Sequence, residues 1–309
     1  MSRRRARGTP VDGVLLLDKP RGITSQTAVS RVKSLYGAAK AGHTGTLDPL
    51  ADGLLPVCLG EATKFAQGLL DADKSYRAVI RLGITTTTAD LEGEVLTQQS
   101  PKATADDIAA VLTRFRGDIM QVPPMYSALK RDGKPLYEYA RAGRDVPREP
   151  REVHIRRLVL EGGDGADFTV LVTCSKGTYI RVLAEDIGAA LGCGACLASL
   201  TRLGVGNLQL DQAVSLAALS ELTPDERLRA LLPPDALVFM LPRVDLEAAE
   251  AACIRVGRPV EWNREPAVEL ARAYGPGGDF MGLVGRDAEG RIVAKRLVSS
   301  GPEPVAATP

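Results

Sequence analysis

The sequence contains few of the residues that bind metal ions or form disulfide bonds. Of its 309 residues, two are histidines and five are cysteines. Cys193 and Cys196 form one CxxC pair, but a zinc site needs four ligands and no second pair stands at a suitable spacing. His43 and His154 lack a third ligand, and we expect His154 to be structural. An odd number of dispersed cysteines fits free thiols in a reducing cytosol. We therefore expect no metal and a cytoplasmic protein.

Long apolar runs are also missing. No stretch approaches the roughly 20 apolar residues of a membrane span. Ser2 to Arg7 is basic, but only residues 14–17 follow as an apolar run. This run is too short for the core of a signal peptide, which has about 7–15 residues. We therefore expect no contact with a membrane.

The sequence has little net charge, at +1, so the overall charge does not indicate a polyanionic partner. The charges are distributed unevenly, however. Residues 1–160 hold 25 Lys and Arg against 18 Asp and Glu, which leaves 14 against 20 for residues 161–309. One face can therefore attract phosphates while the whole chain stays nearly neutral. This asymmetry is a weak indication of nucleic-acid binding, because chance scatter of charges also explains it.

The sequence does contain a mixture of strand and helix patterns. Ser25 and Thr104 are predicted to cap two helices, and residues 41–53 are predicted to form a long glycine-rich loop. We expect strands at residues 14–17, 54–59, 75–82, 151–160, 168–174 and 197–203, and helices at residues 136–141, 179–191 and 245–255. The elements follow no regular strand–helix–strand rhythm. The sequence therefore predicts an α+β fold with a mixed sheet rather than a doubly wound sheet.

Prolines indicate how the chain is divided. Residues 121–150 are rich in proline and basic residues, which predicts an extended insertion, and Pro233, Pro234 and Pro242 precede a new pattern. In that pattern, residues 280–285 and 291–298 flank a hairpin signal. We expect a basic N-terminal tail at residues 1–11, a large domain at 12–239, a small β-rich domain at 240–300 and a frayed tail at 301–309.

The loop at residues 41–53 is the most informative segment, and it reads AGHTGTLDPLADG. Its glycines permit tight turns or close approach to a ligand. Pro49 stiffens the chain directly after Asp48. Such a loop can hold the Asp48 carboxylate rigidly at the mouth of a site, although Gly, Asp and Pro are also the usual residues of a simple turn.

This loop resembles GHTGxLDPxAxG, the signature of the TruB family, the tRNA pseudouridine-55 synthases. Further segments resemble the motifs of that family in the same order: DKPRGITS (18–25), KSYRA (74–78), PPMYSALK (123–130), SKGTYIR (175–181) and LTRLGVG (200–206). Asp52 departs from the pattern, which has Ser or Thr more often. The resemblance covers about residues 12–220, and the C-terminal stretch is similar in outline to the small RNA-binding domain called PUA.

The resemblance implies an isomerase that converts uridine to pseudouridine at position 55, in the T-arm loop of tRNA. It implies that Asp48 is the catalytic carboxylate and that Arg181 pairs with it. Tyr76 and Tyr179 would lie in the uracil pocket, and Leu200 would line it. Tyr76 is also a possible relay for the proton that leaves C5. Without the resemblance, both tyrosines and Leu200 would be interpreted as core residues.

Two further residues would contact the RNA. The resemblance implies that His43 assists RNA binding and the opening of the loop around the target base. Lys130 begins a basic segment, residues 130–157, which can bind phosphates or can simply be a solvated insertion. The reaction has no redox change and no group donor, so we expect no cofactor and no metal. We expect tRNA as the partner, no required protein partner, and a monomer.

The physics of the reaction supports this interpretation. A uridine must leave the base stack before protein groups can reach its glycosidic bond, at a cost of a few kcal/mol. Tyr76 offers a π face for stacking, which contributes about 1–3 kcal/mol per base. Asp48 would attack the sugar C1′ or assist glycal formation, and the sequence does not choose between these routes.

Three other functions are possible alternatives. A non-catalytic RNA-binding factor is disfavoured because Asp48, Tyr76 and Arg181 occur together. A relative that uses a guide RNA also carries the aspartate motif, but the long insertion at residues 84–150 favours a stand-alone enzyme. A methyltransferase would need a glycine-rich nucleotide loop after a strand, and residues 162–165 are predicted to form a hairpin turn instead.

Overall fold

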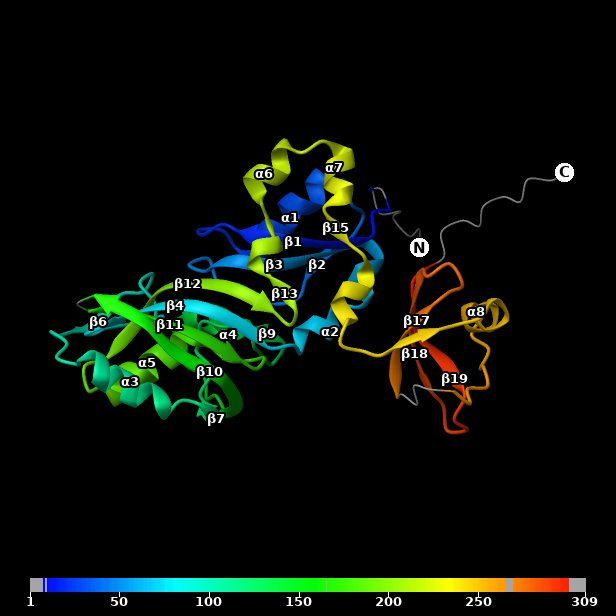
Figure 1. Cartoon of the computed structure of the whole chain (residues 1–309). Helices are drawn as coiled ribbons and strands as arrows, with labels where there is room; N and C mark the ends of the chain where they lie inside the picture. Colours follow the sequence, from blue (N-terminus) through cyan, green and yellow to red (C-terminus); the bar gives the residue numbers. More distant parts are fainter. Residues whose placement is uncertain (1–7, 9, 165, 265–268, 300–309) are drawn as a thin grey trace.

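An 11-stranded mixed sheet forms the larger part of the protein (Figure 1). The computed structural model describes residues 8, 10–164, 166–264 and 269–299. The main strand order is β14-β1-β3-β12-β4-β11-β10-β7, with β13, β15 and β2 paired at its side. The strands of this sheet are β1 (Gly13–Lys19), β2 (Ala41–His43), β3 (Asp52–Leu59), β4 (Lys74–Leu82), β7 (Gly117–Gln121), β10 (Arg151–Asp164), β11 (Asp167–Cys174), β12 (Ala195–Val205), β13 (Leu208–Gln209), β14 (Val214–Ser215) and β15 (Leu231–Leu232).

Most neighbouring strands of this sheet are antiparallel, but β1 pairs with β14 and β12 pairs with β3 in parallel. The helices around it are α1 (Ser25–Leu35), η1 (Gly60–Lys64), α2 (Gln67–Leu70), α3 (Ala105–Thr113), α4 (Leu136–Arg141), α5 (Ile180–Ala190), η2 (Leu210–Gln212), α6 (Leu216–Glu221), α7 (Pro224–Arg229) and η3 (Pro234–Val238). Two small hairpins pair β5 (Ile84–Thr86) with β6 (Val95–Gln98) and β8 (Lys130–Arg131) with β9 (Lys134–Pro135). This arrangement confirms the predicted α+β class with a mixed sheet.

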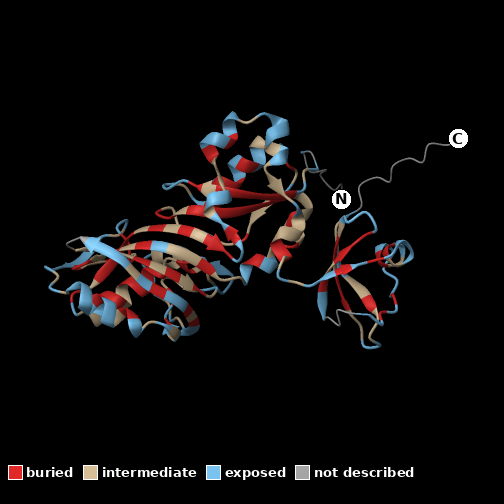
Figure 2. Cartoon of the chain, in the orientation of Figure 1, coloured by how far each residue is buried: buried red, intermediate tan, exposed pale blue. Residues whose placement is uncertain are grey.

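The alternation of side chains along β4 and β11 explains how the sheet forms its core. Ala78 and Ile80 on β4 are fully buried, as is Val170 on β11, whereas the residues between them face the other side. Helix α5 covers the buried face with Leu183 and Ile187. Figure 2 shows the buried residues along these strands and the exposed ones on α6, α7 and the outer loops. Strands β4 and β11 thus have one face in the core, whereas β1 and β3 are buried on both faces.

Several boundaries differ from the sequence predictions. Thr24, not Ser25, caps α1, because the Thr24 side chain accepts a hydrogen bond from the Thr27 N–H. Ser25 is the first helical residue. The predicted loop at residues 41–53 is shorter than expected, since its ends belong to β2 and β3. Thr104 does cap α3, and its capping box with Asp107 confirms that prediction.

The C-terminal part forms a separate four-stranded sheet with its own core (Figure 1). Its elements are β16 (Arg243–Asp245), α8 (Ala248–Arg255), β17 (Leu270–Tyr274), β18 (Phe280–Arg286) and β19 (Ile292–Leu297). The prediction that Asp245 opens a helix was wrong, because Asp245 ends strand β16 and Glu247 caps the helix. The predicted β-rich C-terminal part with its hairpin is confirmed. The exact division at residue 240 stays a prediction.

The two parts pack together at η1, the adjoining Phe65, and η3. Phe65 and Phe280 stack edge to face with ring centroids 5.1 Å apart. The Lys64 Nζ donates to the Leu297 carbonyl at 3.1 Å, and the Tyr274 hydroxyl donates to Asp235. Among the described residues, no helix is both long and apolar enough to cross a membrane. The predicted tail at residues 301–309, and most of that at 1–11, lie outside the described residues.

Candidate active site

The backbone on both sides of Asp48 is fixed by hydrogen bonds. The Ser25 hydroxyl donates to the Leu47 carbonyl at 2.9 Å and accepts from the Leu47 N–H at 2.8 Å. The Gly22 N–H donates to the Pro49 carbonyl at 2.8 Å. Leu47 itself is buried, whereas the Asp48 side chain is 43 % exposed. The loop between β2 and β3 therefore presents a carboxylate to solvent from a rigid backbone.

Arg181 orients this carboxylate by a hydrogen bond. It is the second residue of α5, and its side chain is only 6 % exposed. Its Nε donates to Asp48 Oδ2 at 2.9 Å, while its two other nitrogens donate to the carbonyls of Thr88 and Tyr126 at 2.9 and 2.8 Å. Asp90, also buried, lies 3.6 Å from the same Nε. The guanidinium is thus held in one orientation, with one edge turned to Asp48.

A cavity of about 360 Å³ opens beside this pair. The structure brings Asp48, Arg181, Tyr76, Tyr179 and Leu200 together as lining residues of this cavity. Tyr76 projects from β4, and Leu200 projects from the neighbouring strand β12. Burial raises the pKa of both tyrosines, so their hydroxyls remain protonated at neutral pH. The cavity thus combines aromatic and aliphatic walls with one exposed carboxylate.

His43 lines a second cavity, of about 540 Å³, which shares Asp48 and Arg181 with the first one. The Gly45 N–H donates to His43 Nδ1 at 3.2 Å, so Nδ1 acts as an acceptor and the proton of the neutral ring is on Nε2. Burial, and secondarily the charge of Arg202, lower the pKa of His43. His43 therefore stands beside Asp48 as a neutral, half-buried ring.

Lys130 is not brought into either cavity. It lies in the hairpin of β8 and β9, where it is exposed, whereas the preceding residues Ser127, Ala128 and Leu129 do line the first cavity. Any contact of Lys130 with a ligand would therefore occur outside the cavity.

Three buried charged residues at the site were not predicted from the sequence: Lys74, Asp90 and Arg202. Arg202 is 1 % exposed, and it donates from Nε to the Leu54 carbonyl at 2.7 Å and from Nη2 to Gly45 at 3.2 Å. Burial lowers the pKa of Lys74 to about 8. Lys74 and Arg202 both lie in motif segments, so the resemblance could have indicated them as site residues. Their burial could not be predicted from the sequence.

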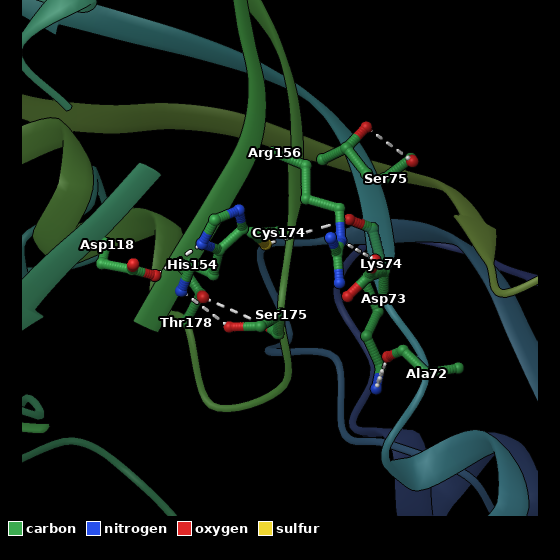
Figure 3. A network of polar contacts seen from close by, with 11 residues as sticks. Ala72, Asp73, Lys74, Ser75, Asp118, His154, Arg156, Cys174, Ser175 and Thr178 are labelled. Atoms are coloured by element: carbon green, nitrogen blue, oxygen red, sulfur yellow. Dashed lines mark hydrogen bonds and ion pairs between the residues drawn. The ribbon is translucent and has the colours of Figure 1, made fainter. Parts of the chain in front are cut away.

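The loop that leads to Tyr179 and Arg181 is tied to strand β10 (Figure 3). The His154 N–H donates to the Ser175 hydroxyl at 2.9 Å, and the Ser175 N–H donates to the His154 carbonyl at 2.9 Å. The Thr178 hydroxyl donates back to the Ser175 carbonyl at 2.9 Å. The His154 ring is hydrogen-bonded to Asp118 at 2.5 Å. These contacts involve His154 in the packing of the loop, and it lines neither cavity.

The described residues offer little that could hold a metal ion. Among them, no group of three or more His, Cys, Asp or Glu side chains is placed to do so. Cys193 and Cys196, the CxxC pair, are free and buried. The residues that line the first cavity offer a carboxylate, an arginine and aromatic walls.

Comparison with known families gives three matches along the chain. Residues 33–180 match the TruB family pseudouridylate synthase N-terminal domain, residues 181–238 the tRNA pseudouridylate synthase B C-terminal domain, and residues 242–298 the C-terminal domain described as pseudouridine synthase II TruB. Together they extend over most of the described chain.

Two similar relatives are both named tRNA pseudouridine synthase B. The one from Methylobacillus flagellatus is 52 % identical over 294 residues, which covers 95 % of this chain and 97 % of the relative. The one from Burkholderia mallei is 55 % identical over 297 residues, which covers 94 % and 98 %.

Two solved structures are similar in fold. A Cbf5-Nop10-Gar1 complex matches with a TM-score of 0.68 and 28 % identity, covering 88 % of this chain and 78 % of that one. An H/ACA RNP bound to a substrate RNA containing 2′-deoxyuridine matches with a TM-score of 0.71 and 23 % identity, covering 97 % and 92 %. At this identity, the second likeness concerns the fold alone.

Proposed function

The chain belongs to the TruB family and is an enzyme that isomerises uridine to pseudouridine in tRNA, and from this premise we propose that its target is the uridine at position 55 in the T-arm loop. The loop AGHTGTLDPLADG and the five further motif segments support this target, because they follow the pattern of the enzymes with that specificity.

Asp48 is the essential carboxylate in this proposal. The observation that carries it is the 2.9 Å hydrogen bond from Arg181 Nε to Asp48 Oδ2 at the edge of the cavity. Asp48 acts on the ribose, by attack on C1′ or by assisting glycal formation. In both routes the C1′–N1 bond breaks, a C1′–C5 bond forms, C5 loses a proton and N1 gains one. The atoms balance without a cofactor or a metal ion.

The target base enters the 360 Å³ cavity by flipping out of the RNA. Tyr76 stacks on the uracil, and Tyr179 and Leu200 complete the walls. Since flipping costs a few kcal/mol, these contacts must offset that cost. Stacking on one aromatic ring, at about 1–3 kcal/mol, is of the required size.

Contacts outside the cavity supply most of the affinity. His43, next to Asp48, supports the opened RNA loop, and Lys130 contacts the phosphate backbone. The enzyme acts as a monomer without a protein partner. The Cbf5 structures contain other proteins, but all five motif segments and the catalytic pair occur here within one chain.

The test is to map pseudouridine in an unmodified tRNA transcript and in an isolated T-arm stem–loop, each incubated with the purified protein in EDTA. We expect one pseudouridine, at position 55, in both RNAs. The stem–loop separates a metal requirement of the enzyme from the effect of magnesium on tRNA folding. A transcript with cytidine at position 55 serves as control. Modification of another uridine would contradict the proposed target, and activity only with an added divalent ion would contradict the metal-free route.

A further inference from the structure

An ion pair joins the two rims of the base cavity. Lys176 Nζ lies 2.7 Å from Asp71 Oδ1, although the two residues are 105 positions apart in the chain. Asp71 directly follows α2, whose last residue, Leu70, lines the cavity. Lys176 and Gly177 line it from the loop between β11 and α5. The pair therefore connects two segments of the chain that both line the cavity.

Both backbones that carry this pair are fixed. On one side, Lys74 Nζ donates to the carbonyls of Leu70 and Ala72 at 2.7 and 2.6 Å. On the other side, Ser175 and Thr178 hold the loop, and Figure 3 shows both anchors together. Only the two charged side chains, which are 64 % and 50 % exposed, are free to move. An exposed ion pair of this kind is weak and can exchange partners.

Lys176 differs from the other cations of the cavity. Lys74, Arg181 and Arg202 also line it, but each is at least nine-tenths buried and donates to backbone carbonyls. Among the described residues that line this cavity, Lys176 is thus the cation that can reach a phosphate at its mouth. Asp71 has a second partner, because Gln67 Nε2 donates to its Oδ2 at 3.2 Å. This contact can keep Asp71 at α2 after Lys176 leaves.

We propose that Lys176 and Asp71 form a strap across the mouth of the base cavity, which the RNA opens by exchanging a phosphate group for the Asp71 carboxylate as the partner of Lys176. The strap rests on the proposed flipping of a base into this cavity. A phosphodiester is a charged acceptor like a carboxylate, so Lys176 keeps an ionic partner in both states. The Asp71 carboxylate competes with the phosphate for Lys176, and it thereby lowers the affinity for RNA only when Lys176 is present.

The test compares Asp71→Asn, Lys176→Gln and the double variant by titration with tRNA at several salt concentrations. Glu161→Gln and Arg77→Gln are matched controls, since that pair is also exposed, with N and O 2.8 Å apart, and Arg77 lies on the strand face opposite Tyr76. Glu161→Gln changes the net charge by the same amount as Asp71→Asn.

We expect Asp71→Asn to tighten tRNA binding about two- to fivefold beyond Glu161→Gln, which is the range that an exposed ion pair allows. Lys176→Gln should lower the slope of log affinity against log salt by about 0.7–0.9, the value for one phosphate contact, and Arg77→Gln should leave it unchanged. When Lys176 is already replaced by Gln, Asp71→Asn should tighten tRNA binding no more than Glu161→Gln does.

The proposed strap would be wrong if Asp71→Asn still tightened tRNA binding in the absence of Lys176. It would also be wrong if Lys176→Gln left the slope of log affinity against log salt unchanged. Thermal melts of each variant check that folding is intact. Pseudouridine formation by the wild type in the same samples tests the proposed function independently. If the wild type converts position 55 and the binding effects are missing, the strap alone is wrong. If no uridine is converted, the proposed function is wrong.

Discussion

At the scale of single residues, the site is built from charged side chains held by backbone carbonyls. Arg181, Arg202 and Lys74 each donate to at least two such carbonyls. Because these contacts need no RNA, the walls around Asp48 are in place before the substrate binds. Removing one of these cations would leave buried carbonyls without donors, so such variants would report on folding as well as on chemistry.

Tyr76 gives a cleaner test of the cavity wall. We predict that Tyr76→Ala lowers the single-turnover rate by about 5- to 150-fold, the equivalent of about 1–3 kcal/mol of stacking. Binding of tRNA should change little, because phosphate contacts supply most of the affinity. Tyr76→Phe is the matched control, since it keeps the ring and removes only the hydroxyl. If affinity fell as far as turnover, Tyr76 would be holding the fold or the RNA instead.

His43 gives a prediction on pH. Its pKa in the folded protein is below the usual 6.5, chiefly through burial, so the unfolded chain binds more protons as the pH falls through 6.5. The stability that His43 contributes is therefore present above about pH 6.5 and is lost as the pH falls through the lowered pKa. NMR titration can measure this pKa directly, because the chain has two histidines and His154→Gln assigns their signals. A His43 pKa at or above 6.5 would contradict the described burial.

At the scale of elements, local patterns predicted the existence of strands and helices well but not their ends. The Thr104 cap was predicted from local signals, which are its residue type and the acidic first turn that follows it. Thr24 and Ser25 are both suitable residues for a helix cap. The Ser25 hydroxyl is engaged by the distant Leu47 backbone, so Thr24 caps the helix. Residues 41–43 form a strand only because β3 is beside them. Pairing of this kind is not visible in a local sequence window.

The hairpin of β8 and β9 gives a prediction at this scale. Replacing Lys130 and Arg131 with Ala should lower the salt dependence of tRNA binding. With fewer phosphate contacts, binding releases fewer counterions from the RNA. Arg131 is already engaged by the Pro147 carbonyl, so most of the change should come from Lys130. The control replaces Arg77 and Arg81, which lie on the face of β4 opposite the cavity. An equal slope in both double variants would show that the hairpin does not touch the RNA backbone.

At the scale of the whole molecule, the order of strands assembles the site. Strand β12 inserts between β3 and β4, although it follows both of them by more than a hundred residues. This insertion brings Leu200 beside the strand of Tyr76, and Arg202 beside the loop of Asp48. The motif segments predicted five residues that line the first cavity, but also Lys130, which does not line it. Which strands are neighbours, and which charges become buried, depend on contacts across the whole sheet and could not be predicted from a single sequence.

The central claim concerns the carboxylate that this assembly presents. Asp48→Asn keeps the size of the side chain and can still interact with Arg181, so the fold and the tRNA affinity should be preserved. An amide cannot act as the nucleophile or base, so turnover should be lost. The matched control is Asp52→Asn, four positions along the chain, which lines neither cavity.

The most direct measurement is therefore pseudouridine formation under single-turnover conditions by the wild type and both variants, next to a tRNA binding titration. The account predicts that Asp48→Asn binds tRNA like the wild type and forms no detectable pseudouridine, while Asp52→Asn remains active. Substantial product from Asp48→Asn would contradict it, and loss of product in Asp52→Asn would then assign the essential carboxylate to Asp52.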